Sequence, residues 1–222
     1  MPANLIILFA KEPVVGQVKT RLIPAITPEF AAELHTAFVR DMIDRFRAFE
    51  GTDFELHTDR TSDAFITPTV TRKLQTSGNL GLKMIHALQV GLDSGYERVM
   101  IIGSDAPTLP AAHVSALLAA DADITFGPAE DGGFYAISAR RVHPAMFNRV
   151  VWSQPDTLLR SIEAVRQCGL SVAVGLRWFD VDAPEDLDLL VRQSDLPVHT
   201  AACLARLRAE QPDTCRCAES VD

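Results

Sequence analysis

Two unbroken apolar runs constrain the fold of this chain more than any other feature. Residues 5–10 read Leu-Ile-Ile-Leu-Phe-Ala, and residues 99–102 read Val-Met-Ile-Ile. Neither run alternates between apolar and polar positions, as a strand with one solvent-facing side does, so each predicts a strand that is buried on both faces. Such strands are typical of parallel sheets that lie between layers of helices.

Helical patterns alternate with strand patterns along the rest of the chain. Thr27-Pro28-Glu29 predicts a helix start, because an N-cap residue precedes a proline at the first helical position, and apolar residues then recur every four positions from Phe30 to Phe46. Further helices are expected at residues 81–92, 110–120, 155–168, after Asp182 and near 200–207, and further strands at 54–58, 70–74, 124–126, 134–137 and 170–179. This order predicts an α/β fold, a three-layer α/β/α sandwich around a mostly parallel sheet, with ligands beyond the carboxyl ends of the strands.

Composition limits the partners of the chain. The net charge of -8, from 29 acidic and 21 basic residues, argues against a broad contact with nucleic acid or anionic lipid. The first residues show neither the basic segment nor the long apolar segment of a secretory leader, so we expect none. No run approaches the ~20 apolar residues of a membrane span, and the four cysteines imply no disulfide framework. We expect a cytoplasmic protein with one domain at residues 1–209 and a polar tail at 210–222 that holds Cys215 and Cys217. The sequence leaves the oligomeric state open, a homodimer included.

The loop after the first apolar run carries a cluster of basic side chains. Lys11, Lys19 and Arg21 surround Gly16, and Glu12 is the one acidic residue in the first 21 positions. Glycine lets the backbone approach a phosphate, and lysine and arginine supply charge and a planar fork that matches phosphate oxygens. A phosphate-binding loop and a solvated basic loop explain this spacing equally well, because the segment matches neither a P-loop nor a dinucleotide fingerprint.

Carboxylates follow two other predicted strands. Asp105 closes the segment Gly103-Ser104-Asp105 that follows residues 99–102, and an aspartate there can bind a divalent cation or form an Asx-turn. Asp180 and Asp182 follow the last predicted strand, and alternate residues of a strand point the same way, so both could share a metal ion with Asp105. The alternative is that Asp182 caps the next helix, with Glu185 three residues further on.

Two glycine-containing turns are further candidates. Asp131-Gly132-Gly133 precedes an aromatic strand, where backbone N–H groups can bind an anionic acceptor and Asp131 can act as a base, although a hairpin turn explains it as well. Gln75 and Gly78-Asn79 precede the helix expected at 81–92 and either touch a base or ribose or form a turn.

Four segments together resemble one family. In chain order they read Phe9-Ala10-Lys11-x-Pro13-x-x-Gly16-x-x-Lys19-Thr20-Arg21-Leu22, Gly103-Ser104-Asp105-x-Pro107-x-Leu109, Gly127-Pro128-Ala129-x-Asp131-Gly132-Gly133-Phe134-Tyr135 and Asp180-Val181-Asp182-x-Pro184-Glu185-Asp186-Leu187. From residue 4 to residue 192 the chain resembles the bacterial glycosyltransferase-like family related to 2-phospholactate guanylyltransferase. More distantly it is similar to the molybdenum cofactor guanylyltransferases and other GT-A enzymes. Phe134 departs from the family pattern, where tyrosine is usual, as does Leu82-Lys83, where an acidic residue and an arginine are commoner.

The resemblance implies a GT-A fold, the Rossmann-like fold of nucleotide-diphosphosugar transferases, with a nucleotide donor and a Mg²⁺ or Mn²⁺ ion. On matching positions it implies that Lys19 and Arg21 bind donor phosphates, that Asp105 and Asp182 bind the metal, and that Gly132-Gly133 binds the acceptor. The complete expected nucleotide and acceptor site consists of Ala10, Lys11, Gly16, Lys19, Thr20, Arg21, Gln75, Gly78, Asn79, Gly132 and Gly133.

Three functions fit these expectations, and nucleotidyl transfer is preferred. Asp105 and Asp182 would hold a metal that polarises the α-phosphate of a nucleoside triphosphate, while Lys19 and Arg21 would offset the charge that develops on pyrophosphate. A small phosphorylated or hydroxyl acceptor would then attack. Glycosyl transfer from a nucleotide sugar would use the same site with Asp131 as the base. A nucleotide-binding module without turnover is the third option.

Overall fold

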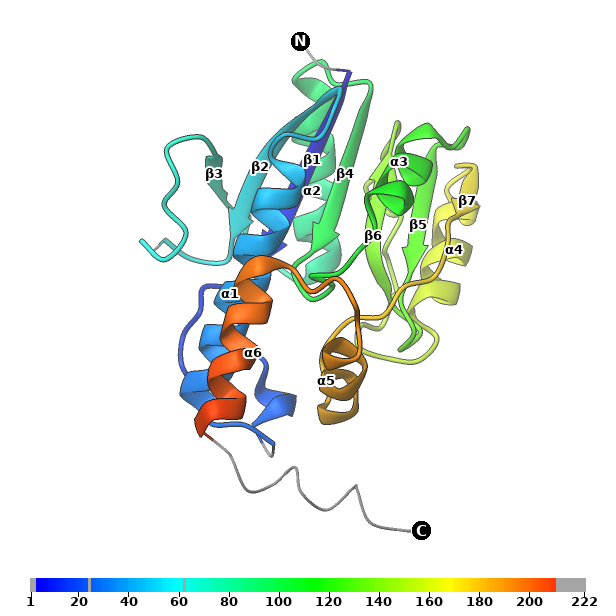
Figure 1. The fold of residues 1–222 in the computed structure, drawn as a ribbon. Helices are drawn as coiled ribbons and strands as arrows, with labels where there is room; N and C mark the ends of the chain where they lie inside the picture. The colour runs from blue at the N-terminus through cyan, green and yellow to red at the C-terminus, as the bar shows by residue number, and fades with distance from the viewer. Residues whose placement is uncertain (1–2, 24, 62, 211–222) are drawn as a thin grey trace.

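A seven-stranded sheet with the order β3-β2-β1-β4-β6-β5-β7 forms the centre of the computed structural model, which describes residues 3–23, 25–61 and 63–210 (Figure 1). The strands are β1 (Asn4–Ala10), β2 (Thr52–Thr58), β3 (Thr71–Leu74), β4 (Arg98–Gly103), β5 (Ile124–Pro128), β6 (Phe134–Ala139) and β7 (Val172–Val174). The helices are α1 (Pro28–Phe46), α2 (Leu80–Asp93), α3 (Ala111–Ala119), α4 (Thr157–Gln167), α5 (Pro184–Val191) and α6 (Val198–Glu210), with a 3-10 turn η1 (Thr20–Leu22). Only β6 pairs antiparallel, with β4 and β5, so the predicted mostly parallel α/β sheet is confirmed for the described residues.

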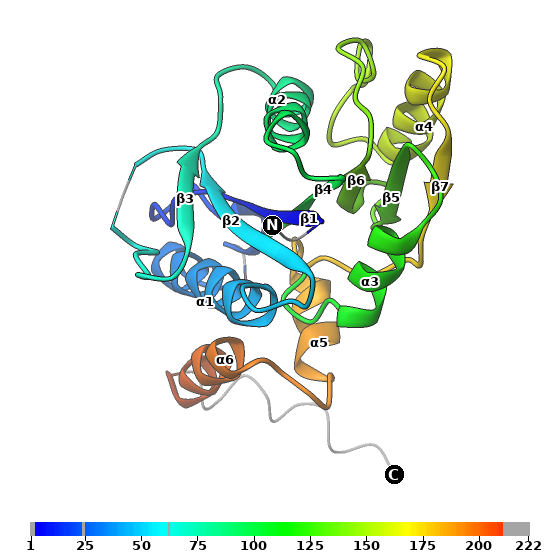
Figure 2. The same ribbon diagram turned by 90° about the horizontal axis from the view of Figure 1, so that it is seen from above.

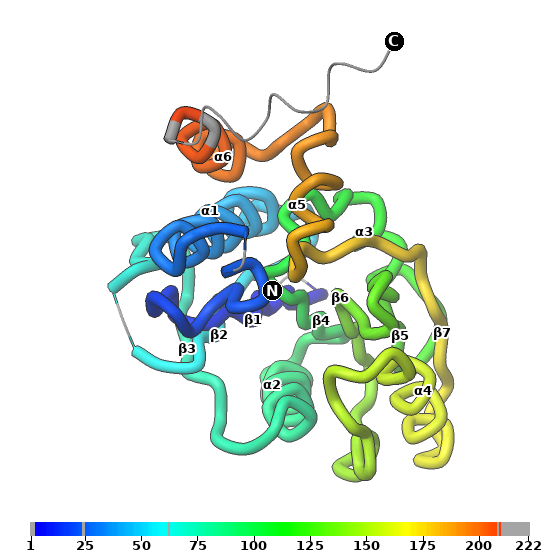
Figure 3. The backbone as a smooth tube through the Cα atoms, turned by 90° about the horizontal axis from the view of Figure 1, so that it is seen from below, coloured from blue at the N-terminus to red at the C-terminus, as the bar shows by residue number. Residues whose placement is uncertain are grey.

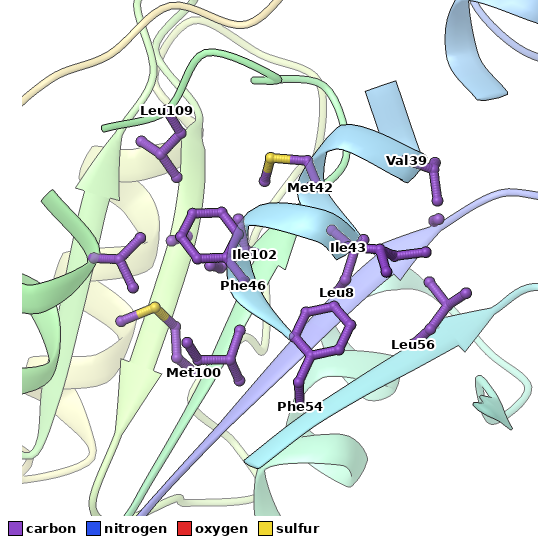
Figure 4. Close-up of a cluster of buried hydrophobic side chains, with 14 of the residues drawn as sticks. Leu8, Val39, Met42, Ile43, Phe46, Phe54, Leu56, Met100, Ile102 and Leu109 are labelled. Atoms are coloured by element: carbon purple, nitrogen blue, oxygen red, sulfur yellow. The ribbon is translucent and has the colours of Figure 1, made fainter. Parts of the chain in front are cut away.

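Helices cover both faces of the sheet. Figure 2 shows α1 and α3 on one side and α2 and α4 on the other, with α6 on the outer side of α1. Alternate residues of β1 face the two layers: Leu8 belongs to the cluster that includes Met42 and Phe46 of α1 (Figure 4), and Ile7 belongs to the cluster that includes Leu88 of α2. The unbroken apolar run therefore reports burial on both faces, as predicted.

Side-chain caps fix two helix starts. The Thr27 hydroxyl accepts a hydrogen bond from the Phe30 backbone N–H at 3.1 Å, and Pro28 occupies the first helical position of α1, as expected. The Asn79 side chain caps α2 in the same way, accepting from the Leu82 backbone N–H at 3.0 Å. Asn79 thus has a structural role at a helix start.

The last strand is shorter than the sequence pattern predicts. Of the expected strand at residues 170–179, only Val172–Val174 pairs with β5, and an isolated bridge joins Trp178 to Ala129 further along. The pairing of β5 with β6 shifts register between Gly127 and Pro128. An irregularity of this kind disrupts a ladder locally, so β7 ends where β5 changes its course.

The prediction that the Asp182 side chain caps the following helix is wrong. Ala183 occupies the N-cap position, and the carboxylate of Asp186 accepts hydrogen bonds from the backbone N–H groups of Asp182 at 2.9 Å and Ala183 at 2.7 Å. Pro184 lies in the first turn, which places the helix start after Ala183 and assigns the capping carboxylate to Asp186. The carboxylate of Asp182 is therefore free for other contacts.

The end of the chain is described only in part. Helix α6 ends at Glu210, the first residue of the predicted tail, and the rest of that tail, including Cys215 and Cys217, lies outside the described residues. The boundary between a domain at 1–209 and a tail stays a prediction. Within the described part of the chain, no helix has both the length and the apolar character needed to span a membrane.

Candidate active site

A cavity of about 650 Å³ opens at the carboxyl ends of β1 and β4. Figure 3 views the molecule from this side, where the loop after β1 and the start of α5 approach each other. Ligands of open α/β sheets bind at such an edge, so the cavity lies where the fold type predicts a binding site. The cavity walls include eight of the predicted site residues, namely Ala10, Lys11, Lys19, Thr20, Arg21, Gln75, Asp105 and Asp182.

Other predicted site residues do not line this cavity. Among the described residues, Gly16, Gly78, Asn79, Asp131, Gly132, Gly133 and Asp180 are absent from its walls. Gly16 has a positive φ of 74° and open space around it, so it shapes the loop that carries Lys19. The proposed ligand roles of these residues stay predictions.

Lys19 lies at the centre of the candidate site. Its ammonium donates to the backbone carbonyl of Val181 at 2.7 Å and to Oδ1 of Asp182 at 3.0 Å, and it forms an ion pair with Oδ1 of Asp105. The ring of Phe38 lies beneath it, 5.4 Å from Nζ to the ring centroid. The side chain of Lys19 is 2% exposed, whereas those of Asp105 and Asp182 are 43% and 37% exposed. Two carboxylates from distant segments therefore meet at one buried cation.

This arrangement shifts the pKa values of both partners toward their charged forms. Burial lowers the pKa of the Lys19 ammonium, but the charges of Asp105 and Asp182 outweigh burial and hold it above its ordinary value. Burial likewise raises the pKa of the Asp105 carboxyl, and the Lys19 ammonium outweighs it, so that pKa lies below its ordinary value. The site consequently holds fixed charges at neutral pH.

Arg21 is the exposed cation of the site. Its side chain is 63% exposed, and its guanidinium lies 3.9 Å from Oδ2 of Asp182, at the outer limit of an ion pair. The fork of the guanidinium matches the oxygens of a phosphate, so Arg21 is placed to contact an anionic ligand that enters the cavity.

His35 lines the cavity although the sequence drew no attention to it as a site residue. It lies on α1, and its Nε2 is 2.9 Å from the Lys11 carbonyl oxygen. Because a carbonyl only accepts, Nε2 carries the hydrogen. Burial lowers the pKa of His35, and this hydrogen bond only partly opposes the effect. A neutral imidazole thus holds the first loop, and an isolated histidine next to the apolar face of a helix gives no sequence signal for such a role.

Gln75 and Lys83 form a second polar group in the cavity wall. The Gln75 amide nitrogen donates to the His57 carbonyl at 3.1 Å and to the Ala10 carbonyl at 3.4 Å, and its amide oxygen accepts from the Lys83 ammonium at 3.2 Å. Gln75 therefore ties the carboxyl ends of β1 and β2 together. Lys83 was not among the predicted site residues. Its departure from the family pattern is the sequence feature that could have pointed to it.

In the turn Asp131-Gly132-Gly133, packing requires a glycine at position 132. Gly132 has a φ of 88°, and a Cβ there would lie 1.9 Å from the Pro155 carbonyl oxygen. The Leu158 backbone N–H also donates to the Gly132 carbonyl at 2.9 Å. The turn thus packs directly against the start of α4, and the hairpin explanation accounts for its sequence.

Asp180 differs electrostatically from its neighbour Asp182. Burial, followed by the negative charges of Asp131 and Asp182, raises the pKa of Asp180 to about 7. Asp131 therefore lies within electrostatic reach of Asp180. The contact with Lys19 is made by Asp182 rather than Asp180.

The donor chemistry of the site fits a hard divalent cation that is also held by substrate. No group of three or more His, Cys, Asp or Glu side chains suited to a metal occurs in the described part of the chain. Mg²⁺ is usually bound by one or two carboxylates together with substrate phosphates and water, and Asp105 and Asp182 supply such a pair. The roles of these residues as metal ligands stay a prediction.

Solved structures share the architecture of this chain. A protein from Desulfovibrio desulfuricans G20, provisionally named a nucleotide-diphospho-sugar transferase, is 31% identical, with a TM-score of 0.83 over 95% of this chain and 96% of that one. A provisionally named glucose-1-phosphate thymidylyltransferase from Bacillus anthracis is 12% identical, with a TM-score of 0.54 over 90% of this chain and 99% of that one. Molybdopterin-guanine dinucleotide biosynthesis protein A from Archaeoglobus fulgidus is 10% identical, with a TM-score of 0.50 over 91% and 99% of the two chains. The fold is therefore of the GT-A type, as predicted.

Sequence comparisons give a family as well as a fold. No curated protein sequence matches the chain. A family model matches residues 34–154, which is more than half of the chain and includes Asp105, Asp131 and the glycines that follow it. The protein is therefore a member of the bacterial family described as "Uncharacterized protein conserved in bacteria (DUF2064)".

Proposed function

We propose that the protein is a metal-dependent nucleotidyltransferase, which transfers a nucleoside monophosphate from a triphosphate to a small acceptor and releases pyrophosphate. The observation that carries this proposal is the meeting of Asp105, Asp182 and the buried Lys19 at the wall of a 650 Å³ cavity, with Arg21 at its opening. The name of one structural relative supports it, because that protein is called a glucose-1-phosphate thymidylyltransferase.

Each of these residues has a defined part in the proposed reaction. Asp105 and Asp182 would bind Mg²⁺ or Mn²⁺, which when bound supplies Lewis-acid stabilisation of the negative charge on phosphate oxygens. Arg21 would bind the outer phosphates through its exposed fork, and Lys19 would add positive charge at the base of the cavity. His35 would keep the Lys11 backbone in place at the edge of the cavity. Such chemistry depends on positioning and charge more than on a strong base.

Release of pyrophosphate tests the proposal. The protein is incubated with each of the four nucleoside triphosphates, with Mg²⁺ or Mn²⁺ and with a panel of phosphorylated and hydroxyl acids. GTP and phosphorylated hydroxy acids are tried first, because the chain resembles a family related to 2-phospholactate guanylyltransferase. We expect metal-dependent release that falls at least about 100-fold in Asp105→Asn, since a transition-state charge contact is lost.

Asp121→Asn is the matched control, because Asp121 is fully exposed and pairs with Arg140 away from the cavity. It should retain full activity. Formation of nucleoside diphosphate from a sugar nucleotide, without pyrophosphate from any triphosphate, would reverse the choice of reaction.

Glycosyl transfer is the second candidate, favoured by the name of the 31% identical relative. In that reaction Asp131 would take the proton of an acceptor hydroxyl. Its charge raises the pKa of Asp180, so it lies within electrostatic reach of that residue. Asp131→Asn separates the two reactions. A large loss of turnover with unchanged donor affinity supports glycosyl transfer, whereas retained turnover supports nucleotidyl transfer.

A further inference from the structure

Every N–H bond of the Lys19 ammonium already has an acceptor. A lysine ammonium has three donors, and here they face the Val181 carbonyl at 2.7 Å, Oδ1 of Asp182 at 3.0 Å and Oδ1 of Asp105. The side chain is 2% exposed, so no donor is left for water. An incoming phosphate can therefore bind Lys19 only if the ammonium gives up one of these internal partners.

The ammonium also fills the position that a bridging metal would need. Each carboxylate turns one of its two oxygens, Oδ1, toward Nζ. A divalent ion shared by these two oxygens would lie about 2.0–2.1 Å from each, closer than the ammonium itself. Two cations cannot share that space, and their repulsion is strong where water is excluded. A metal ion held by these two Oδ1 oxygens therefore excludes the ammonium from its present position.

The backbone around Lys19 is anchored, so the ammonium can move only by rotation of the Lys19 side chain. Lys19 adopts a left-handed conformation with a φ of 48°, and the flanking Val18 and Leu22 are buried at 2% and 0% exposure. The Leu22 backbone N–H donates to the Lys19 carbonyl at 2.9 Å. Because the loop is anchored on both sides of Lys19, rotation of the four-carbon side chain is the available way for the ammonium to leave the carboxylates.

We propose that Lys19 is the resting cation of the site: it holds Asp105 and Asp182 together in the free protein, and a divalent ion reaches them when a phosphate ligand draws the Lys19 ammonium away. Metal and phosphate ligand then raise each other's affinity, and by linkage the two factors are equal. The inference rests on the proposed function, because it assumes that a metal and a phosphate-bearing ligand share this cavity.

Binding of Mn²⁺ alone tests the first half of this proposal. Electron paramagnetic resonance measures free Mn²⁺ with the unaltered protein, Lys19→Met and Lys19→Gln, the last of which keeps a donor for the Val181 carbonyl. We expect both variants to bind Mn²⁺ at least about tenfold more tightly than the unaltered protein, since the competing cation is gone. Lys83→Met is the matched control, because it also removes one positive charge at the cavity, but one that donates to Gln75 rather than to either carboxylate, and it should change the affinity less than about threefold.

Binding of inorganic pyrophosphate, as a stand-in for a donor diphosphate, tests the second half. Calorimetric titration of the unaltered protein should give an affinity at least about tenfold higher in Mn²⁺ than in EDTA. An Mn²⁺ affinity of the unaltered protein equal to that of Lys19→Met overturns the proposal, as does an equal effect of Lys83→Met and Lys19→Met. Pyrophosphate binding that ignores Mn²⁺ overturns it too.

These outcomes separate the inference from the proposed function. Metal-dependent pyrophosphate release together with an unchanged Mn²⁺ affinity in Lys19→Met would contradict the role of Lys19 as a competing cation but support the nucleotidyltransferase. Tighter Mn²⁺ binding in Lys19→Met without turnover of any triphosphate would contradict the nucleotidyltransferase but support the role of Lys19 as a competing cation.

Discussion

Residues of one type behave differently in this site because their neighbours differ. The Asp105 carboxyl has a lowered pKa, since the Lys19 ammonium outweighs the effect of burial. The Asp180 carboxyl has a pKa raised to about 7 by burial and by the charges of Asp131 and Asp182. The distinction lies in the position of a single buried cation, which contacts Asp105 and Asp182. Such paired shifts are typical of functional sites.

Removal of the Asp180 charge should stabilise the protein at alkaline pH. The ordinary pKa is 3.8, so between about pH 4 and 7 the folded protein binds a proton that the unfolded chain lacks, and the free energy of unfolding falls as pH rises through this window. In metal-free buffer, Asp180→Asn should remove this slope and be more stable than the unaltered protein at pH 8 by on the order of 1 kcal/mol, a value reduced for solvent screening.

Urea unfolding at pH 5 and pH 8 measures the effect. Asp121→Asn, at an exposed carboxylate, serves as the control and should show the slope of the unaltered protein. The same difference between Asp180→Asn and the unaltered protein at both pH values would contradict the raised pKa.

At the scale of elements, the docking of α6 on α1 depends on one buried carboxylate. Asp41 of α1 is 5% exposed and accepts hydrogen bonds from the backbone N–H groups of His199 at 2.9 Å and Thr200 at 2.7 Å, and from the Thr200 hydroxyl at 2.6 Å. It therefore caps α6 from another helix. Leu204 of α6 belongs to the same buried cluster as Leu22 and Val181. Because the Val181 carbonyl accepts a hydrogen bond from Lys19, the position of α6 affects the candidate site.

Asp41→Ala should cost about 1–3 kcal/mol of stability, because it removes a helix cap and leaves buried N–H groups without an acceptor. Asp44→Ala is the matched control on the same helix. Its side chain is 52% exposed and pairs with Arg47 and His199, so its loss should cost less than about 0.5 kcal/mol. Chemical denaturation compares the two, and equal costs would show that Asp41 does not hold α6.

At the scale of the molecule, the candidate site brings together segments that are far apart in the chain. Lys19 lies 163 positions before Asp182, and Asp105 follows the central strand β4. A ligand that bridges these segments stabilises the folded state as a whole, because the unfolded chain does not bring them together.

A thermal-shift experiment should detect this coupling. At about 100 times its Kd, a bound nucleotide adds about 2.7 kcal/mol, which raises the Tm of a domain of this size by about 5–10 °C. We expect the full shift only with Mg²⁺ or Mn²⁺ present, and its metal-dependent part should vanish in Asp105→Asn. A shift that is the same without metal and in Asp105→Asn would favour a nucleotide-binding module without turnover.

The sequence by itself determined the layered α/β architecture, because a strand that is buried on both faces needs apolar residues at consecutive positions, and such runs can be recognised directly. The runs at 5–10 and 99–102 became β1 and β4, and Thr27-Pro28 began α1 as expected. Local patterns failed where a neighbouring strand or helix decided the outcome: β7 ends early beside the irregularity of β5, and Asp186 rather than Asp182 caps α5.

Only the tertiary structure decided what the candidate site residues contact. The sequence singled out Lys19, Asp105 and Asp182 as separate motifs. Parallel pairing of β1 with β4 brings the loops of Lys19 and Asp105 to one edge, and the Val181 backbone N–H, which donates to the Asp105 carbonyl at 2.9 Å, brings in Asp182. His35 entered the site through the packing of α1 against the first loop, which no local spacing records. Charge interactions act through space, so the pKa of a carboxyl depends on side chains that only the fold brings near it, as the Lys19 ammonium beside Asp105 shows.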